Sequence, residues 1–295
     1  MTLPISESVA SRFSLGERAE PFRLRSEPPH VHGYAWRHPI PSATILFLHG
    51  VMSHSHWFAE SADLLLDRGI SVYALDRRGS GSSPYEPGHI DDYRDWLDEV
   101  RDVVQLARTE TGVPVHAVGQ CFGANIAIGA VLTRDVELAS IVMLTPGLYV
   151  RPDYDVRAKL RAASHAFRKS RQVRIPLPLS GELFSGDAEV AAWIDGDLLG
   201  AHSTTARTVL EIGLLLRYAR RNVGRLQIPM LVLEGSRDRL ADNEKNRAAL
   251  RRALGDRCSW TTFDAEHFLL AEPCRDAVLD ALAVWVNDER KAALQ

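Results

Sequence analysis

Three side chains that lie far apart in the sequence could together carry out acyl transfer. The first is Cys121, the central residue of the segment 119–123, which reads GQCFG. The other two are Asp238 and His267, and each follows an apolar run. In such a set the thiolate attacks a carbonyl carbon, the imidazole takes the thiol proton, and the carboxylate orients the imidazole. The order nucleophile, acid, base along the chain is an order in which such sets occur.

The residues around Cys121 predict a sharp turn between a strand and a helix. An apolar run at 113–118 precedes the turn, and a second one at 124–132 follows it. Glycines on both sides leave room beside the nucleophile, and a helix N-terminus favours a thiolate. The sequence therefore predicts a thioester intermediate on Cys121. Two other interpretations stay open, namely a buried core cysteine and a cysteine that replaces a natural serine.

The acid and the base are predicted from their positions after strands. The apolar run 228–234 ends shortly before Asp238, and the run 257–263 ends shortly before His267. Sites in open α/β sheets form at the carboxyl ends of the strands. Of the eleven histidines, His267 alone follows the final strand and precedes the last helix. Asp242 is the reserve candidate for the acid, because Asp238 could instead be a turn residue.

Two backbone N–H groups are expected to stabilise the oxygen that becomes negatively charged during acyl transfer. One belongs to Phe122, which directly follows the nucleophile. The other belongs to Val51, which follows His49 and Gly50 at the end of an early apolar run. We expect Val51 and Phe122 to form the oxyanion hole.

Apolar runs alternate with amphipathic segments along most of the chain, which predicts a mostly parallel sheet covered by helices. The predicted strands lie at 43–49, 70–76, 114–119, 138–144, 228–234 and 257–263, with an antiparallel edge strand at 31–38. The predicted helices lie at 56–68, 93–109, 122–133, 243–254 and 274–287. This α/β arrangement would bring the ends of the strands, and the three side chains with them, to one edge of the sheet.

The alternation stops after residue 147, and no strand is expected before 228. We therefore predict a helical cap at 147–225, inserted into a core of 30–146 and 226–288, with an N-terminal extension at 1–29. Lids over active sites are a common use of such insertions. The cap's larger apolar residues, some of which would line an acyl pocket, are Phe167, Phe184, Trp193, Leu198, Leu199, Leu214, Leu215, Leu216 and Tyr218.

The predicted cap carries two basic clusters. Eight Lys or Arg residues lie between positions 151 and 174, and four arginines lie at 217, 220, 221 and 225. A solvated helix face is one explanation. A docking patch for a phosphate-bearing substrate, an acidic acyl carrier protein or an anionic lipid surface is the other.

Bulk composition excludes several classes of function. The 295 residues carry a formal net charge of −3, which does not indicate a nucleic-acid-binding protein. Three cysteines cannot form a disulfide framework, so we expect a reducing compartment, the cytoplasm. No apolar stretch has the roughly 18 residues of a membrane span, and no signal peptide is visible. We expect no metal and no cofactor.

These motifs resemble the α/β-hydrolase superfamily, and within it the monoacylglycerol lipase and lysophospholipase branch. The resemblance rests on segments 49–57, 76–83, 119–123, 235–238 and 266–268, with a cap stretch at 185–199, and spans roughly 43–286. It implies a Cys121, Asp238 and His267 triad with an oxyanion hole at Val51 and Phe122. The branch has serine where this chain has Cys121. Cysteine at this position also occurs in dienelactone hydrolases, polyhydroxyalkanoate synthases and Dieckmann-type cyclases.

Three functions compete on this sequence. The first is a hydrolase of a small-molecule carboxylic ester or thioester, and the complete triad favours it. The second is an acyltransferase or condensing cyclase that takes an acyl group from a carrier protein or coenzyme A. The thiol favours it, because an acyl thioester is more activated toward amine and carbon nucleophiles than an ester. The third is a non-enzymatic binding protein, which a broken triad would indicate.

Overall fold

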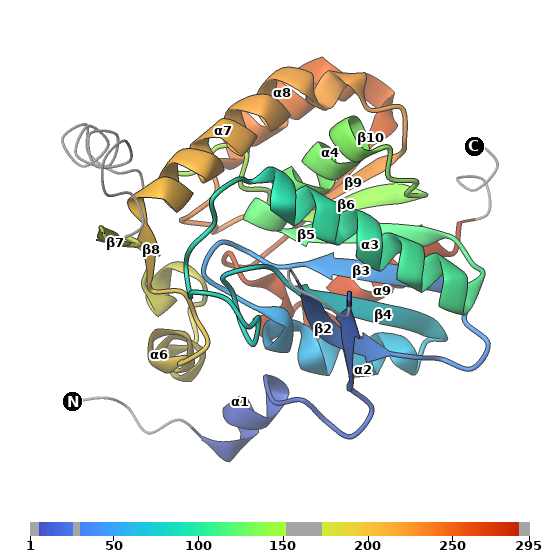
Figure 1. The fold of residues 1–295 in the computed structure, drawn as a ribbon, viewed down its shortest axis with the longest axis horizontal. Coiled ribbons are helices and arrows are strands. Elements are labelled where there is room, and N and C mark those ends of the chain that lie inside the picture. Colours follow the sequence, from blue (N-terminus) through green and yellow to red (C-terminus); the bar gives the residue numbers. More distant parts are fainter. Residues whose placement is uncertain (1–5, 26–29, 152–172, 289–295) are drawn as a thin grey trace.

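The computed structural model describes residues 6–25, 30–151 and 173–288. Its central strands are β1 (Glu20–Leu24), β2 (Val31–Trp36), β3 (Ala43–Leu48), β4 (Ile70–Asp76), β5 (Val115–Gln120), β6 (Ser140–Leu144), β9 (Met230–Gly235) and β10 (Cys258–Phe263). They form an eight-stranded sheet in the order β1-β2-β4-β3-β5-β6-β9-β10 (Figure 1). The pairs β1/β2 and β2/β4 are antiparallel, and the remaining neighbours are parallel.

The middle of the sheet is apolar because helices cover it on both sides. Every residue of β3, β4, β5, β6 and β9 is buried, whereas β2 is partly exposed at alternate positions and the edge strands β1 and β10 have exposed residues. Parallel strands covered on both faces read as continuous apolar runs. The predicted α/β class, with a mostly parallel sheet covered by helices, is confirmed.

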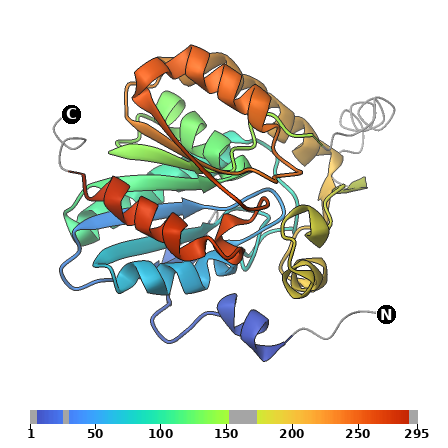
Figure 2. The same ribbon diagram turned by 180° about the vertical axis from the view of Figure 1, so that it is seen from behind.

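One face of the sheet is covered by α3 (Arg94–Thr111), α4 (Phe122–Arg134) and α8 (Asn243–Leu254), with α7 (Ala206–Asn222) packed on α4. The opposite face is covered by α2 (Ala59–Leu66), which follows the short 3₁₀ helix η1 (Ser55–Phe58), and by α9 (Arg275–Val286) (Figure 2). Each face has its own cluster of buried apolar residues. All five helices predicted from the sequence are present, with ends that differ by a few residues.

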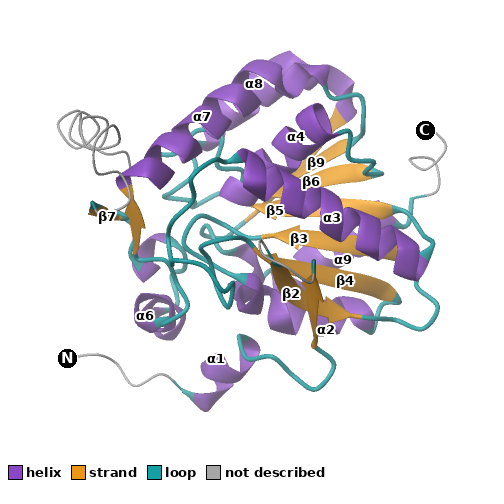
Figure 3. Cartoon of the chain, viewed as in Figure 1, coloured by secondary structure: helices purple, strands orange, loops and turns teal. Residues whose placement is uncertain are grey.

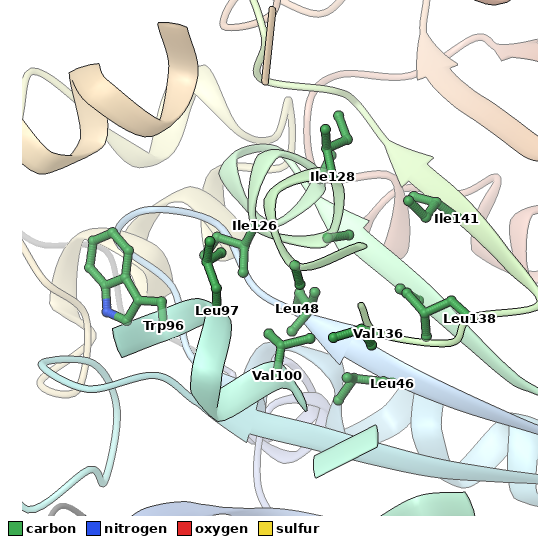
Figure 4. Packing of buried hydrophobic residues seen from close by; sticks show 14 of the residues in the cluster. Leu46, Leu48, Trp96, Leu97, Val100, Ile126, Ile128, Val136, Leu138 and Ile141 are labelled. Carbon is green, nitrogen blue, oxygen red and sulfur yellow. The ribbon is translucent and has the colours of Figure 1, made fainter. Parts of the chain in front are cut away.

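The helix α3 contributes a stripe of buried residues to the first of these clusters. Its buried residues recur at three- and four-residue spacing, which places them along one stripe. Gly112 ends the helix with a φ of 67°, a left-handed conformation that glycine adopts without strain. Figure 4 shows residues of α3 packed against residues of β3 and α4, namely Trp96, Leu97, Val100, Leu46, Leu48, Ile126 and Ile128.

Two strand predictions are wrong. The strand at 31–38 is antiparallel as expected, but it is not an edge strand, because β1 pairs along its outer side. The sheet thus already begins in the predicted N-terminal extension. In addition, the interval predicted to lack strands contains β7 (Arg174–Pro176) and β8 (Ser203–Thr205), which pair antiparallel (Figure 3). Strands of three residues are too short to produce a period in the sequence.

The other described elements between 173 and 225 are helical. They are the 3₁₀ helices η2 (Gly181–Leu183) and η3 (Val223–Arg225), α6 (Ala188–Gly196), and α7. An N-terminal helix, α1 (Glu7–Arg12), packs against α6, and the Phe13 ring stacks on Trp193 at 4.0 Å. Residues 152–172 of the predicted cap lie outside the described part. The division of the chain into core, cap and extension stays a prediction.

Candidate active site

Cys121 occupies a strained turn between β5 and α4. Its φ of 51° and ψ of −110° are unusual for a residue other than glycine. Backbone hydrogen bonds hold the turn, because the Cys121 N–H donates to Leu144 O at 2.9 Å and its carbonyl accepts from Gly147 N at 3.1 Å. Such strain is typical of functional sites, where it fixes how a side chain is presented. Cys121 as a whole is partly exposed, directly after the end of β5.

The glycines beside Cys121 are required by close contacts. A Cβ on Gly123 would lie 1.9 Å from Leu48 O, and one on Gly119 would lie 2.5 Å from Ala124 N. Both contacts are with backbone, which cannot move aside as a flexible side chain can. A Cβ on Gly147 would lie 3.0 Å from the Cys121 sulfur, so glycine there leaves the thiol space to rotate.

We expect Gly123→Ala to destabilise the fold by about 2–3 kcal/mol and to reduce activity with it, since overpacked sites cost about 1–3 kcal/mol. The Cβ would push α4 away from β3 and open the turn. Gly196→Ala is the matched control, because nothing lies within 4 Å of a Cβ at that helix end. Thermal unfolding of both variants checks the prediction. Equal melting temperatures would show that the β3–α4 contact can relax.

Asp238 and His267 meet at the ends of β9 and β10. The His267 Nδ1–H donates to Asp238 Oδ2 at 2.8 Å, since a carboxylate can only accept. The other carboxylate oxygen, Oδ1, accepts the N–H groups of Leu240 at 2.7 Å and Ala241 at 2.8 Å. Both side chains are fully buried. Asp238 is therefore held by three hydrogen bonds, which fix the ring of His267 and its tautomer.

The charge state of His267 is set by its neighbours. Burial lowers the pKa of the imidazole, but the Asp238 carboxylate and the Cys121 thiol outweigh burial and raise this pKa to about 10. The His267 Nε2 atom is buried and forms no hydrogen bond of normal geometry in the described part of the chain. Catalytic hydrogen bonds are often loose without substrate. These neighbours favour the imidazolium form of His267 at neutral pH.

Asp242, the reserve candidate, has a different role. It is the N-cap of α8, where its side chain accepts from Lys245 N and forms an ion pair with the Lys245 ammonium at 2.8 Å. Hydrogen bonds from Lys245 lower the pKa of this carboxylate. The structure therefore brings Asp238, and not Asp242, to His267.

The two predicted oxyanion donors lie beside the nucleophile. Phe122 is the first residue of α4, so its N–H has no partner within the helix. Val51 follows β3, and the N–H groups of both residues form no hydrogen bond with any described residue. Val51, Phe122 and Cys121 all line the same cavity. Two N–H groups without partners beside a nucleophile are the arrangement that stabilises an oxyanion.

Two carboxylates order the loop that carries Val51. Asp76 accepts from Ser55 N at 2.8 Å and from Ser82 N at 2.8 Å. Asp197, in the cap stretch recognised in the sequence, accepts from His54 Nε2 and from Trp57 Nε1, both at 2.8 Å. Burial raises the pKa of Asp197, but the interactions with His54, together with the hydrogen bonds from Trp57 and Leu199, outweigh burial and lower this pKa overall. The loop is therefore tied both to the sheet and to the predicted cap.

A cavity of about 340 Å³ opens over Cys121 and is lined mainly by apolar side chains. Of the nine cap residues considered from the sequence, Phe184 and Leu216 line it, and Phe167 lies outside the described residues. The cavity is also lined by residues that the sequence did not indicate, namely Leu177, Leu179, Val209, Ile212 and Leu240. Helical spacing of Val209, Ile212 and Leu216 was the available signal, but it could not separate a cavity wall from ordinary core.

No group of three or more metal-ligating side chains lies together among the described residues. None of the described helices is both long and apolar enough to cross a membrane. Cys121, Cys258 and Cys274 are free thiols. The predicted cytoplasmic location stays a prediction.

A mostly parallel sheet, with the nucleophile position at a strand-to-helix turn and an acid and a base after later strands, defines an α/β hydrolase. A family model described as "Serine aminopeptidase, S33" matches residues 39–273. The chain belongs to this family. The family description names a serine, whereas this chain has a cysteine in the turn.

Known relatives cover most of the chain. It is 24% identical to the "Monoglyceride lipase" of Homo sapiens over 260 residues, 86% of this chain and 85% of the relative. It is 24% identical to the "Monoacylglycerol lipase" of Mycolicibacterium smegmatis over 253 residues, 83% and 88% of the two chains. A solved structure of a soluble variant of Saccharomyces cerevisiae monoglyceride lipase has a TM-score of 0.79 at 16% identity, covering 92% of this chain and 96% of that one. That likeness concerns the fold, and it confirms the α/β-hydrolase fold expected from the sequence.

Proposed function

We propose that this protein is a cysteine-dependent hydrolase that cleaves a carboxylic ester or thioester through an acyl-Cys121 intermediate. The observation that carries the proposal is the strained turn that presents Cys121 to the His267–Asp238 pair, joined at 2.8 Å. A core cysteine does not need a φ of 51°, two glycines without room for a side chain, and a buried histidine beside it.

The chemistry proceeds in two steps. The Cys121 thiolate forms a bond to the carbonyl carbon, and negative charge moves to the oxygen between the Val51 and Phe122 N–H groups. The bond to the leaving group breaks, and His267 gives it a proton. Water then attacks the thioester and passes a proton to His267, and the carbon–sulfur bond breaks to release the acid. Asp238 holds the His267 ring throughout.

The cavity supports an apolar acyl group as the part of the substrate that is bound. Its lining from the predicted cap includes Leu177, Leu179 and Ile212, and the core adds Met52 and Leu240. Ligand pockets of this size with few polar groups bind mainly by burying apolar surface. The lipase names of the curated relatives point to the same class, a lipid-like ester.

Acyl transfer to an acceptor other than water, including Dieckmann-type condensation, is the second candidate. The apolar lining of the cavity favours it, because a thioester shielded from water lasts long enough to meet an acceptor. The acidic carrier protein named as a partner rests on the basic clusters of the sequence. Of these, residues 157–171 lie outside the described part, and Arg220 donates to Leu148 O within the fold.

Intact-protein mass spectrometry after mixing with a panel of acyl esters and thioesters tests both candidates. We expect an acyl adduct that decays in water with release of free acid. An adduct that persists until an amine, alcohol or carbon nucleophile is added would move the function to acyl transfer. The absence of any adduct and of any turnover across the panel would overturn the proposal.

A further inference from the structure

Arg77 lies directly behind the oxyanion hole, although neither the triad nor the cavity includes it. Its side chain is 1% exposed, among the most buried of the large side chains. One guanidinium nitrogen donates to His49 O, and the other donates to Gly50 O at 2.8 Å. These carbonyls immediately precede Val51 in the chain.

The bond to Gly50 O fixes the direction of a catalytic donor. Gly50 O and the Val51 N–H belong to the same peptide group, which is planar and trans. A carbonyl held toward Arg77 therefore directs the N–H of that group to the opposite side. The His49 ring assists, since its Nδ1 bonds Gly50 O at 2.9 Å and its Nε2 accepts from Arg77 N at 3.4 Å. Burial keeps the pKa of His49 well below its usual value, so the ring is neutral and can do both.

The same guanidinium packs against the residue that supplies the second donor. Its central carbon lies 5.5 Å from the centre of the Phe122 ring and 5.6 Å from that of Trp96. The Arg77 guanidinium thus contacts the side chain of Phe122, which supplies one donor. It also holds the backbone that leads to Val51, which supplies the other donor.

The charge of Arg77 is also unusual for a site this deeply buried. Among the described residues no carboxylate lies within ion-pair distance of it, and the nearby Glu99 pairs with Arg78 at 3.0 Å. Burial lowers the pKa of the Arg77 guanidinium to about 9, so it remains charged at neutral pH. Burying a charge without an ion-pair partner is costly. A positive charge near the substrate oxygen stabilises the negative charge that develops on it, and this benefit explains why a costly buried charge is present.

We propose that Arg77 is the positioning residue of the oxyanion hole, holding the Gly50–Val51 peptide so that the Val51 N–H points at the substrate oxygen. The inference rests on the proposed acyl-transfer function. In this role, Arg77 contributes to stabilisation of the transition state. It contributes little to substrate binding, because its side chain does not line the cavity over Cys121.

Two variants and a matched control test this role. Arg77→Met removes the donors and the charge, and Arg77→Lys keeps the charge but not the two-pronged geometry. Arg78→Met is the control, since Arg78 is the adjacent arginine, paired with Asp95 and Glu99 and not with the loop. Acylation kcat, KM and melting temperature are measured for each. The affinity for an acyl trifluoromethyl ketone is measured as well, because its tetrahedral adduct places an oxyanion in the hole.

For Arg77→Met we expect kcat to fall about 10- to 100-fold, somewhat less than loss of an entire oxyanion donor costs, with KM within about threefold of wild type. Affinity for the ketone should fall by a similar factor. Arg77→Lys should lose less than Arg77→Met. Arg78→Met should lower the melting temperature but keep kcat within about threefold.

A folded Arg77→Met that acylates like wild type would overturn the inference and leave the acyl-Cys121 mechanism intact. Equal losses of kcat in Arg77→Met and Arg78→Met would also overturn it, because they would indicate a purely structural effect. If Arg77→Met does not fold, Arg77→Lys decides, and wild-type kcat in that variant contradicts the proposal. A wild-type protein that never forms the adduct would instead reject the proposed function itself.

Discussion

Cys121→Ala is expected to lower the turnover of any ester or thioester substrate by at least about 10⁴-fold, since loss of a triad nucleophile removes most of the catalysis. KM should change little, because the cavity walls stay in place. The physical reason is that, in the described part of the chain, no other nucleophile lies beside His267 to attack the carbonyl carbon of the substrate. Steady-state kinetics together with adduct mass measurement checks the prediction.

The other two cysteines provide matched controls for this variant. Burial raises the pKa of the Cys258 thiol to about 11, and it also raises that of Cys274. Both thiols are therefore protonated and unreactive at neutral pH. Cys258→Ala and Cys274→Ala should keep wild-type turnover and the acyl adduct. Unchanged turnover in Cys121→Ala would show that the residue in the turn is a structural cysteine.

Cys121→Ser separates the position of the nucleophile from its chemistry. The family description names a serine, and the hydroxyl would occupy the same strained turn. A serine variant that hydrolyses esters but loses transfer to added amines would show that sulfur is needed for passing on the acyl group. If both reactions survive equally, the site is indifferent to sulfur.

The sequence was sufficient for the parts of the fold and site that depend on local pattern. Buried strands of a covered sheet are continuous apolar runs, so β3 to β6 and β9 were predictable from the positions of these runs in the sequence. The turn at Cys121 was predictable because close backbone contacts leave only glycine at Gly119 and Gly123. Asp238 and His267 followed from their positions after strands, since parallel strands end at one edge of a sheet.

Features that depend on contacts between distant segments were not predictable. In the sequence, Arg77 is one of two adjacent arginines. Only the fold shows that Arg77 is buried, whereas Arg78 is partly exposed and forms an ion pair with Glu99. The pairing of β1 outside β2 depends on the path of the chain and not on a period. The sequence favoured Asp238 as the acid and kept Asp242 in reserve, and only their partners in the fold show that Asp238 holds His267 while Asp242 caps α8.

That distinction gives the second prediction of large effect, a loss of about 10²–10⁴-fold in kcat for Asp238→Asn. Both carboxylate oxygens of Asp238 accept hydrogen bonds, one from the His267 ring and the other from two backbone N–H groups. Asparagine has a single acceptor oxygen. If that oxygen faces the backbone, the NH₂ group of the asparagine faces His267 Nδ1. The ring proton then moves to Nε2, where it prevents the imidazole from accepting the proton of Cys121. The lost charge also lowers the pKa of His267, because Asp238 raises it.

Asp242→Asn is the matched control for this variant, because it makes the same change four positions away. The amide oxygen can still cap α8, since Asn and Asp are equally good N-caps, so only the ion pair with Lys245 is lost. The change should cost about 1 kcal/mol or less of stability, with kcat close to wild type. Kinetics and thermal unfolding of the two variants, measured across pH, separate the roles. Loss of kcat in Asp242→Asn together with wild-type kcat in Asp238→Asn would reassign the acid to Asp242. A loss of kcat confined to Asp238→Asn would mean that the three hydrogen bonds to its carboxylate orient His267. The size of the decrease in kcat would then measure how strongly the reaction depends on the tautomer of the imidazole.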